Sequence, residues 1–123
     1  MLVVGINGSP NSDGSTAFLV NEVLRSCREL GAETDIIHVM DALEGQEKPF
    51  CVACSTPCEE NCHREKKLAL SYDLLRSADA LVVGSPVYFG TVSAQLKAFW
   101  DKSRNIRSER VLTGKPGGAC AVG

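Results

Sequence analysis

The sequence predicts a doubly wound α/β protein, in which helices cover both faces of a parallel sheet. The first observation is the order of its segments: strand, helix, strand, insert, helix, strand, helix, strand. The second is that the strand in residues 80–84 is a continuous apolar run, which is typical of parallel sheets buried on both faces. Right-handed crossovers between these segments would place all four strands in one sheet.

The chain has 123 residues, which predicts a single domain over residues 1–123. Its net charge of -2, without a basic block, argues against nucleic-acid binding. No apolar run reaches the roughly 20 residues that span a bilayer, and the N-terminus lacks the charged start of a signal peptide. We therefore expect a cytoplasmic protein with no membrane partner, whose thiols stay reduced.

The first half of the chain predicts two strands and one helix. Residues 2–6 are an apolar run that stops at Asn-Gly-Ser-Pro, which indicates a buried strand ending in a loop. A helix is expected from Ser15 to a stop at Gly31, and residues 34–39 predict the second strand. The apolar stripe expected to face the core from this helix comprises Phe18, Leu19, Val23, Leu24, Cys27 and Leu30.

The second half begins with an irregular insert. Residues 41–65 show no clear period, and a cysteine-rich insert is expected at about residues 45–65. A long stretch without secondary structure inside a small domain is usually functional. A helix over residues 66–76, a strand over 80–84, a helix from 93 to about 104 and a strand over 118–122 complete the expected order.

The first loop, residues 8–16 (GSPNSDGST), follows the first strand. Open α/β sheets bind ligands beyond the carboxyl ends of their strands, and this loop combines hydroxyls with a helix N-terminus, which suits a phosphate. It is not a Walker A loop, because five residues separate Gly8 from Gly14 and Ser15 replaces the lysine. The alternative is a Ser-capped helix after an ordinary turn, and both interpretations stay open.

The second segment, residues 85–102 (SPVYFGTVSAQLKAFWDK), follows the third strand. It places Tyr88 and Phe89 beside Gly90, and aromatic faces next to accessible backbone suit a flat ring. The alternative is that these aromatic side chains only close the end of the sheet.

The first loop and the second segment together resemble the two flavin-binding segments of the NADPH-dependent FMN reductase family. The resemblance covers nearly the whole chain, and the cysteine insert is most similar to that of the iron–sulfur flavoprotein branch. It implies a flavodoxin-like fold with strand order 2-1-3-4-5. The fifth strand and final helix of that fold are not found in this sequence.

The resemblance also implies positions for FMN. The phosphate would lie on Ser9, Asn11, Ser15 and Thr16, and no catalytic side chain is expected. The isoalloxazine ring would be wrapped by Pro86, Val87, Tyr88, Phe89, Gly90 and Thr91. Lys97, Trp100 and Asp101 belong to the same motif as helix and interface residues. NAD(P)H or ferredoxin is implied as electron donor, and a homodimer or homotetramer as the assembly.

Four cysteines form a C-x2-C-x3-C-x3-C pattern at Cys51, Cys54, Cys58 and Cys62. Four thiolates in so short a span suit a [4Fe–4S] cluster, which is also what the resemblance implies, although that branch generally begins with CxxCxxC. A structural zinc site or no metal at all are the alternatives, and His63 could serve as a substitute ligand. Cys27 and Cys120 are predicted to be core thiols.

These observations lead to one main hypothesis, an FMN-dependent oxidoreductase or electron-transfer flavoprotein that couples FMN to a [4Fe–4S] cluster. An NAD(P)H-dependent flavin reductase without a cluster is the first alternative. A zinc-stabilised, non-catalytic binding module is the second.

Overall fold

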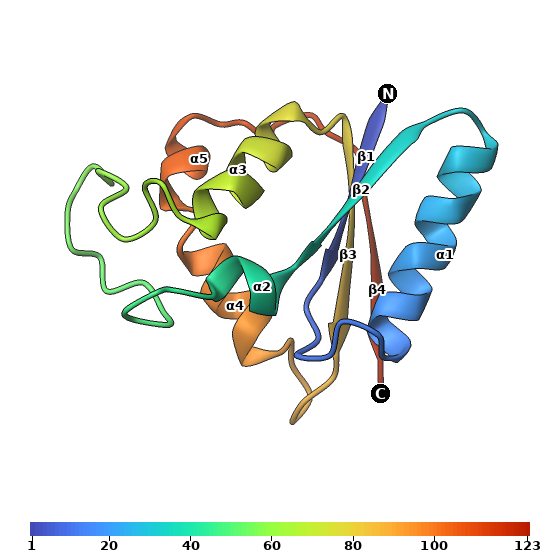
Figure 1. Cartoon of the computed structure of the whole chain (residues 1–123), viewed down its shortest axis with the longest axis horizontal. Coiled ribbons are helices and arrows are strands. Elements are labelled where there is room, and N and C mark those ends of the chain that lie inside the picture. Colours follow the sequence, from blue (N-terminus) through green and yellow to red (C-terminus); the bar gives the residue numbers. More distant parts are fainter.

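The computed structural model describes residues 1–123 and shows one parallel sheet between helices (Figure 1). Its four strands lie in the order β2-β1-β3-β4 and all pair in parallel. The predicted fold class is therefore confirmed, with the first four positions of the flavodoxin-like order filled. The strands are β1 (Leu2–Asn7), β2 (Glu33–His38), β3 (Ala80–Pro86) and β4 (Gly117–Val122).

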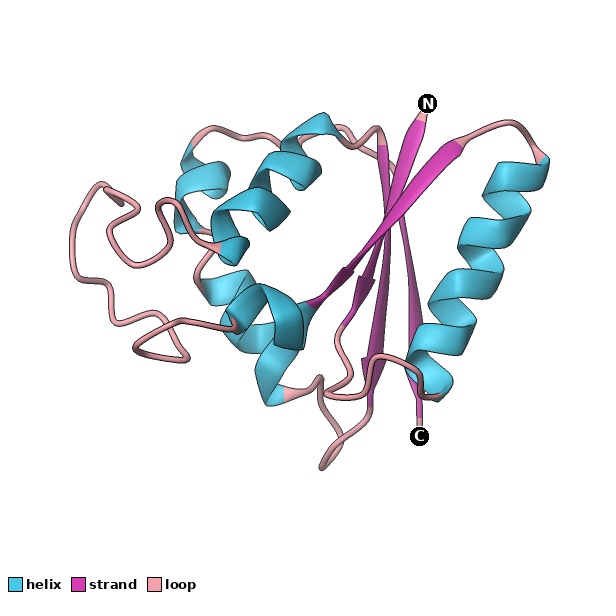
Figure 2. Ribbon diagram, viewed as in Figure 1, coloured by secondary structure: helices cyan, strands magenta, loops and turns pink.

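One helix covers one face of the sheet and the other helices lie on the opposite side (Figure 2). The lone helix is α1 (Ser15–Glu29), which packs against all four strands. The other side holds α2 (Val39–Leu43), α3 (Lys67–Ser77), α4 (Ala94–Asp101) and α5 (Arg104–Ser108). Both α2 and α5 have five residues and were not predicted, because so short a helix contains too few turns to show a period. No helix is long and apolar enough to cross a membrane.

The predicted apolar stripe of α1 is wrong in most of its positions. Phe18 and Leu30 are 62% and 89% exposed, and Leu24 is the only member of the stripe that is fully buried. The helix instead buries a neighbouring face that begins with small side chains, because glycines in the sheet let it approach closely. The buried residues of α1 are Thr16, Ala17, Val20 and Leu24.

Two glycines of the sheet set how closely α1 approaches. A Cβ atom on Gly84 would lie 2.5 Å from Val20 Cγ2 and 3.0 Å from Thr16 Cγ2. A Cβ atom on Gly5 would lie 2.6 Å from Val20 Cγ1. Since real Cβ atoms do not come so close to other heavy atoms, only glycine permits this helix position. The start of α1 is thereby held close to the carboxyl edge of β3.

The insert between α2 and α3 contains no helix or strand, as predicted (Figure 1). It is attached to the corner between α4 and α5. Lys102 Nζ donates to Gln46 Oε1 at 2.8 Å, and an Arg104 guanidinium nitrogen donates to the Ser55 carbonyl oxygen at 3.2 Å. Asn105 Nδ2 also donates to a carboxylate oxygen of the insert, Glu60 Oε1, at 2.7 Å. These contacts fix the insert against the helical layer; the single-domain organisation of residues 1–123 stays a prediction.

Replacing Gly84 by alanine should destabilise the fold and displace the start of α1. The added methyl group would overlap Val20 and crowd Thr16, so we expect the free energy of unfolding to fall by about 1–3 kcal/mol. Urea denaturation measures this change. Gly118→Ala is the matched control, because nothing lies within 4 Å of a Cβ at that position of the neighbouring strand. Equal stability losses in the two variants would contradict the close-approach argument.

Candidate functional site

The first loop and the second segment are joined at the carboxyl edge of the sheet. Gly8 N donates to the Gly84 carbonyl oxygen at 2.8 Å. Ser93 Oγ donates to the Gly8 carbonyl oxygen at 2.5 Å, and the same oxygen accepts from Leu96 N to cap α4. Two segments that are more than 70 residues apart in sequence are therefore held together by backbone and side-chain hydrogen bonds.

Asn7 organises the first loop, and sequence reasoning missed it. Its side chain is fully buried; Oδ1 accepts from Ser9 N at 3.1 Å and Nδ2 donates to the Asn11 carbonyl oxygen at 2.9 Å. Nδ2 also lies 3.0 Å from His38 Nδ1 at the end of β2. Because an amide nitrogen can only donate, this contact makes His38 Nδ1 the acceptor. The available signal was an Asn directly after an apolar strand and before Gly8.

The N-terminus of α1 is not capped by a side chain. Its N-cap residue is Gly14, and no hydroxyl or carboxylate of the first loop accepts from the first turn. The Ser-capped alternative is therefore wrong, and the first turn's N–H groups keep their capacity to bind an anion. Of the predicted phosphate residues, Ser9 and Thr16 are buried and Asn11 and Ser15 are exposed. Ser9 Oγ is engaged by Asn11 N at 3.1 Å.

The second segment begins with a tight turn that presents aromatic side chains. Tyr88 and Thr91 exchange two backbone hydrogen bonds of 3.1 and 3.2 Å. Between them Phe89 and Gly90 have φ values of 52° and 77°, as in a type I′ turn. A bulky residue at positive φ is strained by about 1–3 kcal/mol, and such strain concentrates at functional sites. Phe89 is completely exposed, so packing within this chain does not explain its aromatic side chain.

These two segments fit the two ends of FMN by the chemistry of their groups. The uncapped first turn of α1 offers N–H donors to a phosphate, and the turn after Pro86 offers exposed aromatic faces to a planar ring. Pro86 is buried, and Val87, Tyr88, Gly90 and Thr91 are exposed beside Phe89. The interpretation of Tyr88 and Phe89 as plugs of the sheet end is wrong, since neither is buried.

The four clustered cysteines line a single pocket of about 230 Å³ in the insert. Cys51, Cys58 and Cys62 are half-buried and Cys54 is exposed, and all four are free thiols. Cationic side chains from outside the cysteine cluster line the same pocket, where they favour bound negative charge. These are Lys48, Lys66, Lys102 and Arg104, and the pocket's one acidic side chain is Glu47.

The geometry of the thiols bears on which metal centre they could hold. No three His, Cys, Asp or Glu side chains are gathered closely enough to hold one metal ion. Each thiolate of a [4Fe–4S] cluster binds a different iron, so its ligands stand farther apart than the ligands of a single ion. Four thiols that line one pocket supply the number and kind of ligands that such a cluster takes.

His63 and Tyr72 connect this pocket to the core. His63 Nδ1 lies 3.3 Å from Cys62 Sγ, and its ring meets Tyr72 edge-on at 5.3 Å. Burial lowers the pKa of His63, and burial raises the pKa of Tyr72 with a further contribution from Cys62, Cys51 and Cys58. The Tyr72 hydroxyl donates to the Phe99 carbonyl oxygen of α4 at 2.7 Å. The cysteine pocket thus rests on buried aromatic side chains of α3 and α4.

The remaining predicted residues lie outside the first loop and the aromatic turn of residues 86–91. Cys27 and Cys120 are half-buried. They pack against the smaller core, which is the cluster of buried apolar side chains comprising Val3, Val20, Leu24 and Val82. Burial raises the pKa of Cys120. Lys97 and Asp101 form an ion pair on the surface of α4, and Trp100 is 40% exposed beside them. An interface role for these three residues stays a prediction.

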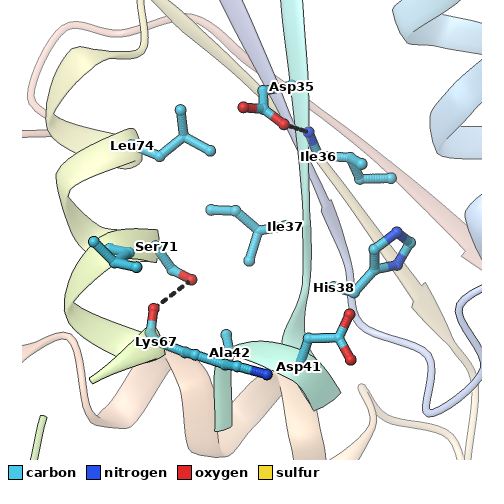
Figure 3. Close-up of a pocket in the computed structure, with 10 residues that line it drawn as sticks. Asp35, Ile36, Ile37, His38, Asp41, Ala42, Lys67, Ser71 and Leu74 are labelled. Carbon is cyan, nitrogen blue, oxygen red and sulfur yellow. Dashed lines mark hydrogen bonds between the residues drawn. The ribbon is translucent and has the colours of Figure 1, made fainter. Parts of the chain in front are cut away.

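Another hollow, of about 410 Å³, lies between β2, α2 and α3 (Figure 3). Most of its polar side chains are already bound within the chain, and the Asp41 carboxylate is the exception. Asp35 accepts from Ile36 N, Ser71 Oγ donates to the Lys67 carbonyl oxygen, and Lys67 Nζ pairs with Glu44. Ile37 and Leu74 contribute apolar surface to the space between the strand and α3. This hollow offers no set of convergent free polar groups and is not the site.

The sheet order and the two joined segments at its carboxyl edge define a protein of the flavodoxin-like class. The chain belongs to the NADPH-dependent FMN reductase family, whose profile matches residues 1–123.

Named relatives lie in two groups. An iron-sulfur flavoprotein of Methanocaldococcus jannaschii is 41% identical over 100% of this chain and 62% of its own length. An iron-sulfur flavoprotein of Methanosarcina thermophila is 32% identical over 100% of this chain and 63% of its own length. An NAD(P)H dehydrogenase (quinone) of Cupriavidus metallidurans is 31% identical over 86% of this chain and 49% of its own length. The chain thus spans less than two thirds of these relatives.

Solved structures agree with the fold. An NADH:FMN oxidoreductase in its apo form superposes with a TM-score of 0.60 at 29% identity, covering 82% of this chain and 49% of the other. RosB with a bound riboflavin-phosphate intermediate superposes with a TM-score of 0.69 at 20% identity, covering 98% of this chain and 50% of the other. The second similarity concerns the fold alone.

Replacing Asn7 by alanine should loosen the first loop. The change leaves Ser9 N without its acceptor inside the protein, so the free energy of unfolding should fall by roughly 1–3 kcal/mol. Amide hydrogen exchange should increase at residues 8–11 beyond the increase elsewhere. Asn11→Ala is the control, because the Asn11 side chain is exposed and only its backbone bonds to Asn7 and Ser9. Unchanged exchange in the Asn7 variant would show that the loop does not depend on this side chain.

Proposed function

We propose that this chain forms an FMN-dependent oxidoreductase domain in which the flavin exchanges electrons with a [4Fe–4S] cluster. The observation that carries the proposal is that one helix, α4, begins at the joined flavin segments and ends at the pocket lined by four cysteines. Eight residues of helix extend about 12 Å, so one rigid element relates the two sites.

The first loop would hold the FMN phosphate. The N–H groups of the first turn of α1 and the hydroxyls of Ser15 and Thr16 would donate to it, with Ser9 and Asn11 shaping the loop around it. The sheet also fixes the position of Thr16, because its methyl group lies against Gly84. The helix dipole adds favourable potential without a charged side chain.

The second segment would hold the isoalloxazine ring. Tyr88 and Phe89 would cover the ring, and the backbone of residues 86–91 would reach its polar edge. The paired backbone bonds of Tyr88 and Thr91 fix the turn, so the aromatic side chains need little reorganisation on binding. FMN, when bound, supplies chemistry that accepts electrons in pairs or singly.

The four-cysteine pocket would hold the cluster. Cys51, Cys54, Cys58 and Cys62 would each bind one iron, and the cationic lining would offset the negative charge of four thiolates and sulfide. A cluster transfers single electrons, which complements two-electron flavin chemistry. NAD(P)H, suggested by the family, or ferredoxin would supply the electrons, and a homodimer or homotetramer would be the working assembly.

Anaerobic purification followed by visible spectroscopy and metal analysis tests this proposal. Flavin bands with a broad shoulder and about four irons per chain are expected. A yellow protein without metal would instead support the flavin reductase without a cluster. One zinc per chain would replace the cluster with a structural site. A colourless chain that does not take up added FMN would refute both flavin functions and favour the non-catalytic module.

The Thr16→Val variant should bind FMN more weakly while keeping its fold. Valine preserves the methyl contact with Gly84 and removes only the hydroxyl, whose hydrogen bond to a charged phosphate is worth about 1.5–3 kcal/mol. The Kd measured by flavin fluorescence quenching should therefore rise roughly 10- to 100-fold. Ser26→Ala removes a hydroxyl farther along the same helix and should leave the Kd unchanged. An unchanged Kd in Thr16→Val would exclude this hydroxyl from the phosphate site.

The Cys58→Ala variant should lose iron and keep FMN. Removing one of four ligands leaves an incomplete donor set, whereas the flavin segments lie elsewhere on the chain. Iron and flavin contents per chain after anaerobic reconstitution measure both effects. Cys27→Ala and Cys120→Ala are the controls, because these thiols pack against the smaller core and not in the pocket. Iron loss of equal size in all three variants would speak against a specific four-cysteine site.

A further inference from the structure

Lys102 is a buried cation without a carboxylate partner. Its residue is 3% exposed, although lysine is rarely buried unless it is paired. Its Nζ donates to Gln46 Oε1, a neutral oxygen, at 2.8 Å, and none of the ion pairs in the structure includes it. Burying an ammonium is costly, so a compensating negative charge is expected nearby.

The buried position of Lys102 is imposed by the fold. Lys102 is the C-cap residue of α4, and its backbone N–H donates to the Ala98 carbonyl oxygen at 3.1 Å. The negative end of the helix dipole lies beside it and stabilises the ammonium only in part. The next helix, α5, starts two residues later, so Lys102 lies at the corner between the two helices.

The groups that can supply negative charge to the pocket of Lys102 are the exposed Glu47 carboxylate and, once they bind a metal centre, the four cysteine thiols. Lys102 lines the same pocket as Cys51, Cys54, Cys58 and Cys62. Lys66 and Arg104 line it too, but both have hydrogen bonds to backbone oxygens of the insert, the carbonyls of Gly45 and Ser55. Lys48 also lines the pocket, but it is exposed like Lys66, and Arg104 is half-buried, so Lys102 is the one buried cation of the lining.

We propose that Lys102 is the counter-cation of the centre bound by the four cysteines and that it raises the reduction potential of that centre. This inference rests on the proposed cluster. One-electron reduction would add one negative charge to a bound cluster. It would neither break nor form a bond at the thiolates. A nearby buried cation stabilises the more negative, reduced state, because a charge attraction is screened less in a buried pocket than in water. Lys102 is thus a positioning residue for charge and not a ligand.

Three variants test this role by the midpoint potential of the cluster and by iron content and thermal stability, none of which depends on enzymatic turnover. Lys102→Met keeps the length and apolar stem of the side chain and removes its charge, whereas Lys102→Arg keeps the charge. Lys97→Met is the matched control, because Lys97 lies on the same helix in an exposed ion pair with Asp101, outside the pocket. Each full-length variant is reconstituted anaerobically with iron, sulfide and FMN. Iron content, thermal stability and the cluster's midpoint potential, followed by electron paramagnetic resonance during redox titration, are then measured.

We expect a more negative cluster potential in Lys102→Met and wild-type potentials in Lys102→Arg and Lys97→Met. A folded Lys102→Met chain that binds FMN but not iron, beside a Lys102→Arg chain that binds both, also supports the counter-charge. An unchanged potential in Lys102→Met overturns the inference, and so does loss of iron from both Lys102 variants, which indicates a purely structural role. A wild-type chain that takes up FMN but no iron is distinguishable from these results, because it overturns the proposed cluster itself.

Discussion

The hydrogen bonds that meet at Gly8 are the interaction on which the rest of the site depends. Gly8 donates to the Gly84 carbonyl oxygen and accepts from Ser93 Oγ, so one residue joins β1, β3 and the start of α4. There is no room for a side chain there, because a Cβ on Gly8 would lie 2.8 Å from the Gly84 oxygen. The first loop, the aromatic turn and α4 consequently share one fixed corner at the carboxyl edge of the sheet, where open α/β proteins bind their ligands.

The helix α4 connects that corner of the sheet to the cysteine insert. Its N-cap residue, Ser93, bonds to the first loop, and its C-cap residue, Lys102, lines the four-cysteine pocket. Tyr72 supports its middle through the hydrogen bond to the Phe99 carbonyl oxygen and packs against His63 on its other side. A pocket built from irregular chain is in this way attached to helices, which hold its lining in a fixed position.

The loops that sequence reasoning located and the residues that it missed differ in the range of their interactions. The first loop and the aromatic turn were located at strand ends because turn chemistry and helix starts depend on neighbouring residues, whereas their roles in binding FMN stay a prediction. Asn7 was missed because its role depends on His38 across the sheet, and Lys102 because its burial depends on Gln46 in the insert. The apolar stripe of α1 was wrong for the same reason. Its orientation follows from Gly5 and Gly84, which lie outside the helix on two neighbouring strands of the sheet.

The sequence by itself determined the fold class, the position of the first loop and the aromatic turn at strand ends and the presence of four thiols in one insert. Periodicity, glycine and proline positions and cysteine spacing are local properties, and they can be read along the chain. The tertiary structure alone decided that the first turn of α1 stays uncapped, that Phe89 is fully exposed and that the four thiols share a pocket with a buried lysine. Each of these features depends on which residues, distant in sequence, pack beside it, and the sequence pattern does not give that packing.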